Sequence, residues 1–212
     1  MQVQELPVAF GGEAGRELIR LRLAGFPGPS ALDGRHVMDA KQIQSAVPAA
    51  VLVPLVNRAD GVHVLLTQRT DHLTSHAGQV SFPGGRCDPG DTSPEDTALR
   101  ETEEEIGVPR ACVGLLGRLP EYFIPTGYRV IPVVGWIEPP VAVQPDPFEV
   151  AEVFEVPLAF LLDPARHKRE TAERGGRTRE FFAIPFGRHN IWGATAGMLV
   201  TLYHALTPGA AR

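Results

Sequence analysis

The spacing of apolar residues divides the first part of the chain into a helix, an irregular arm and two buried strands. Residues 13–24, EAGRELIRLRLA, repeat apolar positions at helical spacing, and GFPGPSALDG then ends the pattern with Gly and Pro. Residues 48–57 and 62–68 are apolar runs suited to buried strands. The Asp60-Gly61 pair between them predicts a tight hairpin turn.

The second half of the chain is dominated by strand patterns and ends in a helix. Residues 112–124 and 128–138 resemble two strands joined through the Pro-Thr-Gly turn between them. The elements predicted after them are a strand at 149–156, a short helix in PLAFLLD, a strand at 179–185 and a helix at 191–206. That last helix carries an apolar stripe of Ile191, Met198, Leu199, Leu202 and Leu206. Strands around a few helices, without regular alternation, predict an α+β fold with no internal repeats.

One more helix is expected in the middle of the chain, after the loop GQVSFPGGRCDPGDTSP. Ser93 is suited to cap its first turn, and Pro94 sits where a missing N–H costs nothing. At roughly 100° per residue one side of this helix must face the core. The residues on that side are Ala98, Leu99, Thr102 and Ile106.

Four glutamates crowd this helix, within the stretch RETEEEIG. Glu101, Glu104 and Glu105 share one face because they stand at i, i+3 and i+4, whereas Glu103 points toward solvent. The face could be an ordinary solvated surface, since like charges at i,i+4 cost only about 0.2 to 0.5 kcal/mol per pair. A carboxylate cluster is also the ligand set that Mg²⁺ or Mn²⁺ prefers.

Neighbouring residues favour the second interpretation. Gly84 and Gly85, just upstream, allow a backbone to come close to a ligand. Arg100 can reach Glu104 along the helix and fix the rotamer of its side chain.

The stretch GRCDPGDTSPEDTALRETEEEIGV, residues 85–108, resembles the Nudix box, a loop-helix-loop motif of hydrolases that cut a nucleoside diphosphate linked to another group. The Arg-Glu, Glu-Glu and Gly parts of the box stand at matching spacing in Arg100, Glu101, Glu104, Glu105 and Gly107. Two positions depart from the box: Asp91, with one residue more before the arginine, replaces the usual glutamate, and Thr102 replaces a large aliphatic residue. The resemblance implies a Nudix-like α/β/α sandwich with a mixed β-sheet at residues 48–212, preceded by a helix and arm at 1–47.

A second segment, LLTQRTDHLTSHAGQVSFPGG at residues 65–85, resembles the coenzyme A pyrophosphatase branch of that family. The Leu-Leu-Thr-x-Arg start, Gly78 and the Phe-Pro-Gly-Gly end match, whereas Asp71 and Thr74 replace a small residue and an arginine. IWGATAGML near the C-terminus also resembles this branch. The implied reaction is hydrolysis of coenzyme A to 3′,5′-ADP and 4′-phosphopantetheine.

The resemblance also implies a metal site. Glu101, Glu104 and Glu105 would hold Mg²⁺ or Mn²⁺, with the backbone carbonyl of Gly85 as a further ligand. Such ions neutralise the diphosphate and lower the pKa of a bound water.

The carboxylate that deprotonates this water is left open between this helix and the loop that contains Glu149 and Glu152. The expected catalytic residues are Arg100, Glu101, Glu104, Glu105 and Glu152.

An arginine is expected to bind the 3′-phosphate of coenzyme A, because a guanidinium group can donate two hydrogen bonds to a phosphate. Arg69 lies in the matched segment and is the first candidate, although a structural role at a strand end has equal weight. The expected substrate-binding residues are Arg69, Gly84, Gly85 and Arg86, with Arg58, Arg118 and Arg129 as weaker candidates. Structural roles are expected for His72, His76, Phe82, Pro83 and Trp192, the last in the core.

Composition argues against several classes of protein. The 212 residues carry a formal charge of −5, which argues against a general nucleic-acid binder, because such binding rests on Lys and Arg. Cys87 and Cys112 have no metal-knuckle or disulfide spacing, so a reducing cytoplasm is expected. The N-terminus lacks a secretory signal, and no apolar run approaches the roughly 20 residues of a membrane helix.

Two alternatives remain beside the coenzyme A reaction. One is a Nudix pyrophosphatase acting on another nucleoside diphosphate derivative, such as ADP-ribose or NADH. The other is a nucleotide-binding module without catalysis, against which the intact carboxylate set argues, because such a module has no need for repelling glutamates. The arm before residue 48 either packs on the domain or pairs two subunits in a homodimer.

Overall fold

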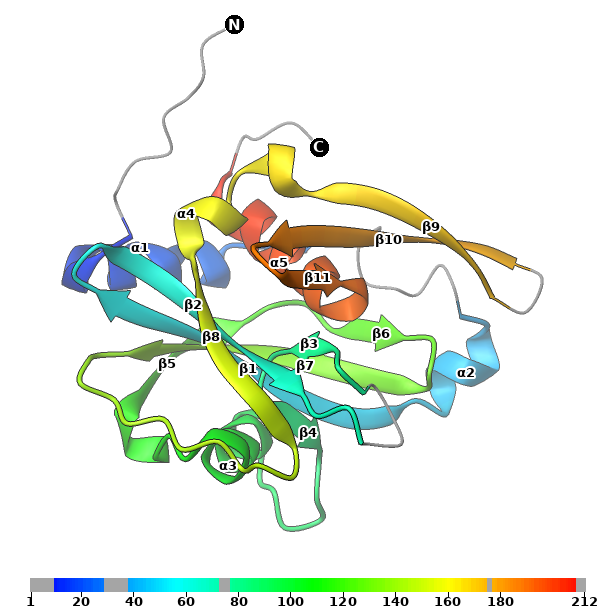
Figure 1. Ribbon diagram of the computed structural model, residues 1–212, viewed down its shortest axis with the longest axis horizontal. Coiled ribbons are helices and arrows are strands. Elements are labelled where there is room, and N and C mark those ends of the chain that lie inside the picture. Colours follow the sequence, from blue (N-terminus) through cyan, green and yellow to red (C-terminus); the bar gives the residue numbers. More distant parts are fainter. Residues whose placement is uncertain (1–9, 29–37, 73–76, 175–176, 209–212) are drawn as a thin grey trace, which may run out of the picture.

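The computed structural model describes residues 10–28, 38–72, 77–174 and 177–208, and its centre is a mixed eight-stranded sheet (Figure 1). The strands run in the order β3-β2-β1-β7-β5, with β4 paired to β1, β6 to β7 and β8 to β2. β1 and β7 are parallel, and the other pairs are antiparallel. These strands are β1 (Val47–Arg58), β2 (Gly61–Arg69), β3 (Val80–Ser81), β4 (Gly84–Arg86), β5 (Val113–Arg118), β6 (Tyr122–Ile124), β7 (Tyr128–Ile137) and β8 (Val150–Pro157). The α+β fold with a mixed sheet is thereby confirmed.

The central strand β1 explains why its sequence is a continuous apolar run. Ala50 and Leu52 pack in one core cluster, whereas Ala49 and Val53 pack in another on the opposite face of the sheet. A strand covered on both faces has no polar side to alternate with its apolar side. The turn after it is the predicted one, with Arg58 opposite Gly61.

Helices cover both faces of the sheet. α3 (Pro94–Ile106) packs on the face formed by Ala50 and Leu52 of β1, and α1 (Gly12–Ala24) and α5 (Gly193–Leu206) lie on the other face (Figure 1). A second sheet of three antiparallel strands lies beside α5. Its strands are β9 (Lys168–Arg174), β10 (Arg177–Phe186) and β11 (His189–Trp192), and the remaining helices are α2 (Ala40–Gln44) and α4 (Leu158–Leu161), with 3₁₀ turns at Arg110–Cys112 and Pro164–Arg166.

The described part of the N-terminal arm packs on the domain. Ile19 and Leu23 of α1 are buried in the same cluster as Leu199 of α5. Arg22 also donates a hydrogen bond to the backbone carbonyl of Leu206. Within the described ranges, no helix is long and apolar enough to cross a membrane.

Two predicted elements differ from the structure, and one strand of the second sheet was not predicted. The strand expected at residues 112–124 is two strands, β5 and β6, because the segment between them contains Pro120, which has no N–H for a sheet. The C-terminal helix begins at Gly193 rather than at Ile191, which instead pairs with Ile184 in the second sheet. β9 was not predicted, because its described side chains are exposed and mostly polar and give no apolar period.

Candidate active site

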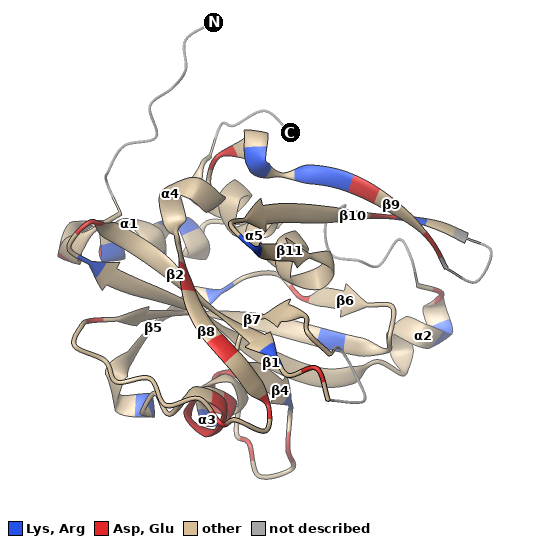
Figure 2. Ribbon diagram, in the orientation of Figure 1, with Lys and Arg blue, Asp and Glu red and all other residues tan. Residues whose placement is uncertain are grey.

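Local sequence positions the acidic helix as expected. The N–H of Asp96 donates to the Ser93 hydroxyl at 3.2 Å, and Gly107 ends the helix in the left-handed conformation. Thr102 is fully buried, and its hydroxyl donates to the carbonyl of Ala98 at 2.6 Å. The departure from a large aliphatic residue at this position therefore leaves no unpaired polar group in the core. In Figure 2 much of the ribbon of α3 is coloured red, which marks Asp and Glu positions.

The three predicted glutamates are buried to different extents. The side chain of Glu105 is 5% exposed, that of Glu101 19% and that of Glu104 59%. The N–H of Gly84 donates to Glu105 Oε2 at 3.2 Å. Glu101 lies against Gly85 so closely that a Cβ there would come within 2.5 Å of its carboxylate carbon. The two glycines therefore bring the backbone of β4 against the glutamates.

These carboxylates face a common space. Burial, helped by the negative charges of Glu149 and Glu101, raises the pKa of Glu105 to about 8 although the Gly84 N–H and Arg69 act to lower it. Burial also raises the pKa of Glu101, with added repulsion from Glu104 and Glu149. These carboxylates therefore lie close enough to repel one another and to raise one another's pKa values.

Arg100 is held in place by Asp91, the residue that departs from the Nudix box. Its Nε and Nη2 each donate to an Asp91 oxygen at 3.0 Å, and the Thr97 hydroxyl donates to the same carboxylate at 2.8 Å. Its Nη1 donates to Glu101 Oε1 and to Glu104 Oε2, both at 3.0 Å. The aspartate therefore orients the arginine, which in turn orients two of the three glutamates.

We expect Asp91→Asn to reduce the free energy of unfolding at pH 7 by about 1 to 3 kcal/mol, the usual cost of losing a charged hydrogen-bond partner. The Arg100 guanidinium holds the pKa of Asp91 well below its ordinary value. The stabilisation is thus complete above the unfolded-state pKa of about 4 and is lost as the pH falls further. Denaturant titrations of both proteins at pH 7 and at pH 3 measure this difference. A gap between wild type and variant that is equal at both pH values would contradict it.

Arg69 joins the carboxylate cluster. Its Nη1 lies 3.6 Å from Glu105 Oε1, and its Nη2 lies 3.7 Å from Glu149 Oε2. It therefore bridges the helix to the loop before β8, and Glu149 lies beside the cluster.

The structure does not bring Glu152 to this cluster, which corrects the expectation that it acts with the helix glutamates. Glu152 Oε2 lies 3.1 Å from His189 Nε2 and 2.6 Å from Arg188 Nη2, next to the second sheet. The pairing of β8 with β2 is irregular just before Glu152, so the alternation of its side chains is shifted. Val150 consequently packs in the cluster under α3, whereas Phe154, on the same side as Glu152, packs in the opposite one.

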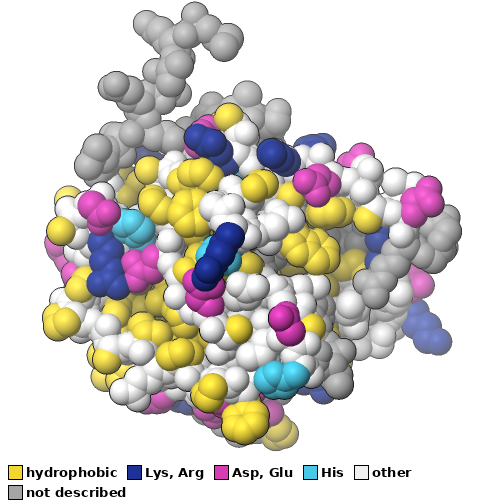
Figure 3. Space-filling view, in the orientation of Figure 1, with side chains coloured by type: hydrophobic (Ala, Val, Ile, Leu, Met, Phe, Trp, Pro, Cys, Tyr) yellow, Lys and Arg dark blue, Asp and Glu magenta, His cyan; other side chains and the backbone are white. Residues whose placement is uncertain are grey.

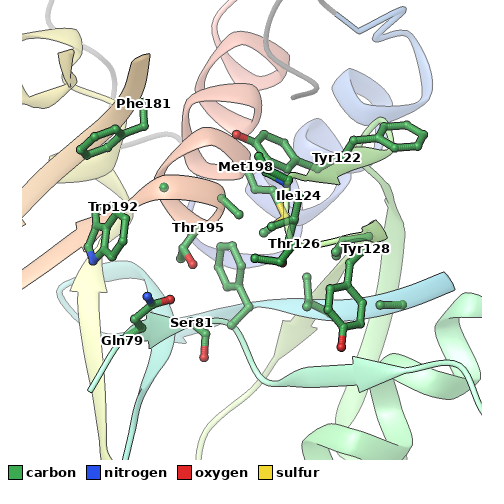
Figure 4. Close-up of a pocket in the computed structure, with 18 of the residues that line it drawn as sticks. Gln79, Ser81, Tyr122, Ile124, Thr126, Tyr128, Phe181, Trp192, Thr195 and Met198 are labelled. Carbon is green, nitrogen blue, oxygen red and sulfur yellow. The ribbon is translucent and has the colours of Figure 1, made fainter. Parts of the chain in front are cut away.

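A pocket of about 490 Å³ opens beside the carboxylates, on the α5 side of the main sheet. All four predicted substrate-binding residues line it: Arg69, Gly84, Gly85 and Arg86. Its far walls come from β6, β10, β11 and α5, and in Figure 4 Phe181 and Trp192 stand on one side and Tyr122 and Tyr128 on the other. Most of the lining is apolar, as is usual for a small-molecule site.

Trp192 was expected in the core, and this is wrong. Its side chain is 40% exposed and lines the pocket, because β11 ends there and Gly193, with φ of 64°, turns the chain into α5. Phe82 is buried, as expected of a residue that shapes the loop. His76 and Thr74 lie outside the described residues, and His72 is exposed.

The weaker arginine candidates lie away from the pocket. Arg58 pairs with Glu155, Arg118 with Glu95 and Arg129 with Glu121. The sequence missed Tyr128, Phe181 and Met198 as lining residues, since they come from three elements with no shared motif.

The cluster suits a hard divalent cation by its chemistry. Its donors are all carboxylate oxygens, which Mg²⁺ and Mn²⁺ prefer, and a cation would favour the charged forms whose pKa values are raised. Among the residues described, no three acidic, His or Cys side chains already converge as a ready-made metal site. Arg100 stands between Glu101 and Glu104 and bonds both.

Comparison with known proteins agrees with this geometry. Residues 46–174 match the NUDIX domain family. Two similar proteins are named uncharacterized Nudix hydrolase NudL. The one from Escherichia coli O6:H1 is 44% identical over 151 residues, which cover 71% of this chain and 78% of that protein. The one from Yersinia enterocolitica is 41% identical over 151 residues, which cover 71% of this chain and 77% of that protein. A solved Nudix hydrolase from Alicyclobacillus acidocaldarius, 19% identical, covers 77% of this chain and 93% of its own with a TM-score of 0.49. The family match spans more than half of the chain and includes the glutamate helix, so this protein belongs to the Nudix hydrolase family.

Proposed function

We propose that this Nudix hydrolase cuts the pyrophosphate bond of coenzyme A, or of a derivative, to give 3′,5′-ADP and 4′-phosphopantetheine, with Mg²⁺ or Mn²⁺ as cofactor. One observation carries the choice of substrate. The segment at residues 65–85, which resembles the coenzyme A branch, forms the pocket wall next to the glutamates. Its lining residues are Arg69, Gln79, Val80, Ser81, Phe82, Gly84 and Gly85.

The pocket suits a long substrate with a diphosphate in its middle. It extends from Gly84 and Gly85, which touch Glu105 and Glu101, to Phe181 and Trp192 at the second sheet. A diphosphate held at the glycines thus places one end of the molecule in a mostly apolar pocket.

The cofactor would be held by Glu101, Glu104 and Glu105, with the carbonyl of Gly85 beside them. Bound there, it supplies charge neutralisation at the diphosphate and a water of lowered pKa.

The side chains of the protein orient the carboxylates, balance their charge and accept a proton. Arg100 orients Glu101 and Glu104, and Arg69 balances the charge of Glu105 and Glu149. A carboxylate of α3 or Glu149 accepts the proton of the attacking water. Glu152 would first have to leave its pairing with the second sheet.

Arg86 borders the pocket and is suited to a phosphate at its mouth. Its Nε and Nη2 donate to the Tyr128 hydroxyl at 3.1 and 2.5 Å. The side chain is thus oriented while its remaining N–H donors, including those of Nη1, can still bind an anion.

The test is to incubate the protein with coenzyme A and Mg²⁺ or Mn²⁺ and to separate the products chromatographically. We expect 3′,5′-ADP and 4′-phosphopantetheine in equal amounts, and no product when EDTA removes the metal. ADP-ribose and NADH are run in parallel. Cleavage of either with coenzyme A left intact would contradict the substrate, and binding without any cleavage would support the non-catalytic alternative.

A further inference from the structure

Arg179 is a half-buried cation on the wall of the pocket. It lies on β10 opposite Ala172 of β9, and both residues line the pocket together with Phe181, two positions along the same strand. No hydrogen bond or ion pair joins its guanidinium group to any other residue in the described part of the chain, Glu180 on the same strand included. A cation in a mostly apolar wall, with no acidic partner among the described residues, is suited to an anion brought by the ligand.

The other arginines that border the pocket are already engaged. Arg69 bridges Glu105 and Glu149, and two nitrogens of Arg86 donate to the Tyr128 hydroxyl. The guanidinium of Arg179 therefore has more donors available than either of them, and a phosphate can accept two of these donors at once.

The surroundings of Arg179 suit a nucleoside. Phe181 and Trp192 contact each other edge to face, with ring centroids 5.6 Å apart, and both rings border the pocket (Figure 4). Aromatic rings next to an arginine offer an apolar surface for a base and a cation for its phosphate.

Arg179 and Phe181 also lie outside both the segment that matches the NUDIX domain and the segments that resemble the coenzyme A branch. The match to the NUDIX domain ends at residue 174, and Arg179, Phe181 and Trp192 all follow it. Groups outside the shared segment are suited to select the substrate, whereas the shared helix carries the chemistry.

We propose that Arg179 binds a phosphate group that the substrate carries in addition to the diphosphate that is cut, and that it thereby determines specificity. The inference rests on the proposed function, in which this group is the 3′-phosphate of coenzyme A. Neither the Nudix box nor the segment at residues 65–85 contains this residue.

The experiment compares coenzyme A with 3′-dephospho-coenzyme A, which differs only by that phosphate. Arg179→Gln should lower kcat/KM for coenzyme A about 10- to 100-fold and change it less than about 2-fold for the dephospho form, because only the first substrate loses a charged hydrogen bond. Arg179→Lys should fall between wild type and Arg179→Gln on coenzyme A, since it keeps the charge but not the bidentate geometry.

Arg169→Gln is the matched control. Arg169 lies on β9 over the ring of Phe182 and does not border the pocket, yet its loss changes the net charge equally. This variant should keep the wild-type ratio between the two substrates. An equal loss on both substrates in Arg179→Gln, or no loss on either, would overturn the proposal.

A binding measurement separates this inference from the proposed function, because it needs no turnover. Calorimetric titration with 3′,5′-ADP and with 5′-AMP should show weaker binding of 3′,5′-ADP to Arg179→Gln and unchanged binding of 5′-AMP. That result supports the phosphate site even if wild type leaves coenzyme A intact, in which case only the proposed function fails. Equal binding of 3′,5′-ADP by wild type and variant would contradict the role of Arg179, whereas the proposed hydrolysis of coenzyme A would still stand.

Discussion

Glu105→Gln is expected to lower kcat about 1000-fold while the protein stays folded. The carboxylate is buried against Gly84 and faces Glu101 and Glu149, so it is central to the proposed cation site. Losing a ligand charge there removes several kcal/mol of stabilisation from the transition state. Glutamine keeps the size of the side chain and an oxygen that can accept from the Gly84 N–H. Turnover of coenzyme A with Mg²⁺ measures the effect, and Glu104→Gln is expected to lose activity in the same assay.

Glu103→Gln is the matched control, because it removes the same charge from the same helix. Glu103 is exposed and lies near Arg110, with Oε2 3.6 Å from Nε, away from the pocket. Its activity should stay within about 2-fold of wild type, as for most surface changes. Equal losses in Glu103→Gln and Glu105→Gln would show that general acidity of the helix matters, and not the buried position.

Thermal unfolding without metal checks that Glu105→Gln does not act through misfolding. Because the pKa of Glu105 is raised to about 8, the unfolded chain ionises first, and this group destabilises the fold increasingly as pH rises from about 4 to 8. The variant without the ionisable group should therefore be at least as stable as wild type at pH 7.5. A lower Tm for the variant would mean that lost structure explains part of the lost turnover.

Gly84→Ala is expected to reduce the free energy of unfolding by about 3 kcal/mol or more. Gly84 has φ of 151°, which costs about 1 to 3 kcal/mol for a residue with a side chain. A Cβ there would also lie 2.5 Å from the Cα of Val51 and closer still to the carbonyl oxygen of Ala50. Those atoms belong to the backbone of the central strand and cannot move aside cheaply, which adds about 1 to 3 kcal/mol. Denaturant unfolding measures the loss.

Gly90→Ala in the following loop is the control for Gly84→Ala. A Cβ at Gly90 meets nothing within 4 Å, and its φ lies outside the left-handed range. The substitution should change stability by less than about 0.5 kcal/mol. Similar stabilities for the two variants would contradict the role assigned to Gly84.

One face of the surface carries side chains of both charges. On the face shown in Figure 3, basic and acidic side chains are interspersed among apolar ones rather than gathered into one basic patch.

The acidic helix was predictable from sequence almost residue by residue. Ser93 caps it, Thr102 and Ile106 face the core, and Glu101 and Glu105 share the face toward the site. Helical geometry depends on residues three and four positions apart, so a short stretch of sequence determines both the element and the side from which each carboxylate projects. The hairpin at Gly61 was predictable for the same local reason.

Tertiary structure decided that Glu149, in the loop before β8, lies beside the site and that Glu152, on β8, does not. An alternating pattern predicts a strand at residues 149–156, but an irregularity in its pairing with β2 sends Glu152 to the opposite face from Val150. Such a shift depends on the partner strand and not on the strand's own pattern.

The sequence by itself thus determined the glutamate helix, the glycines beside it and the mixed character of the sheet. Tertiary structure alone decided the far wall of the pocket, where Arg179, Phe181 and Trp192 line the same cavity as residues of β6 and β7. These residues are brought together by pairing and packing between segments distant along the chain. Local periodicity contains no information about such contacts, because it reports only which side of an element is buried.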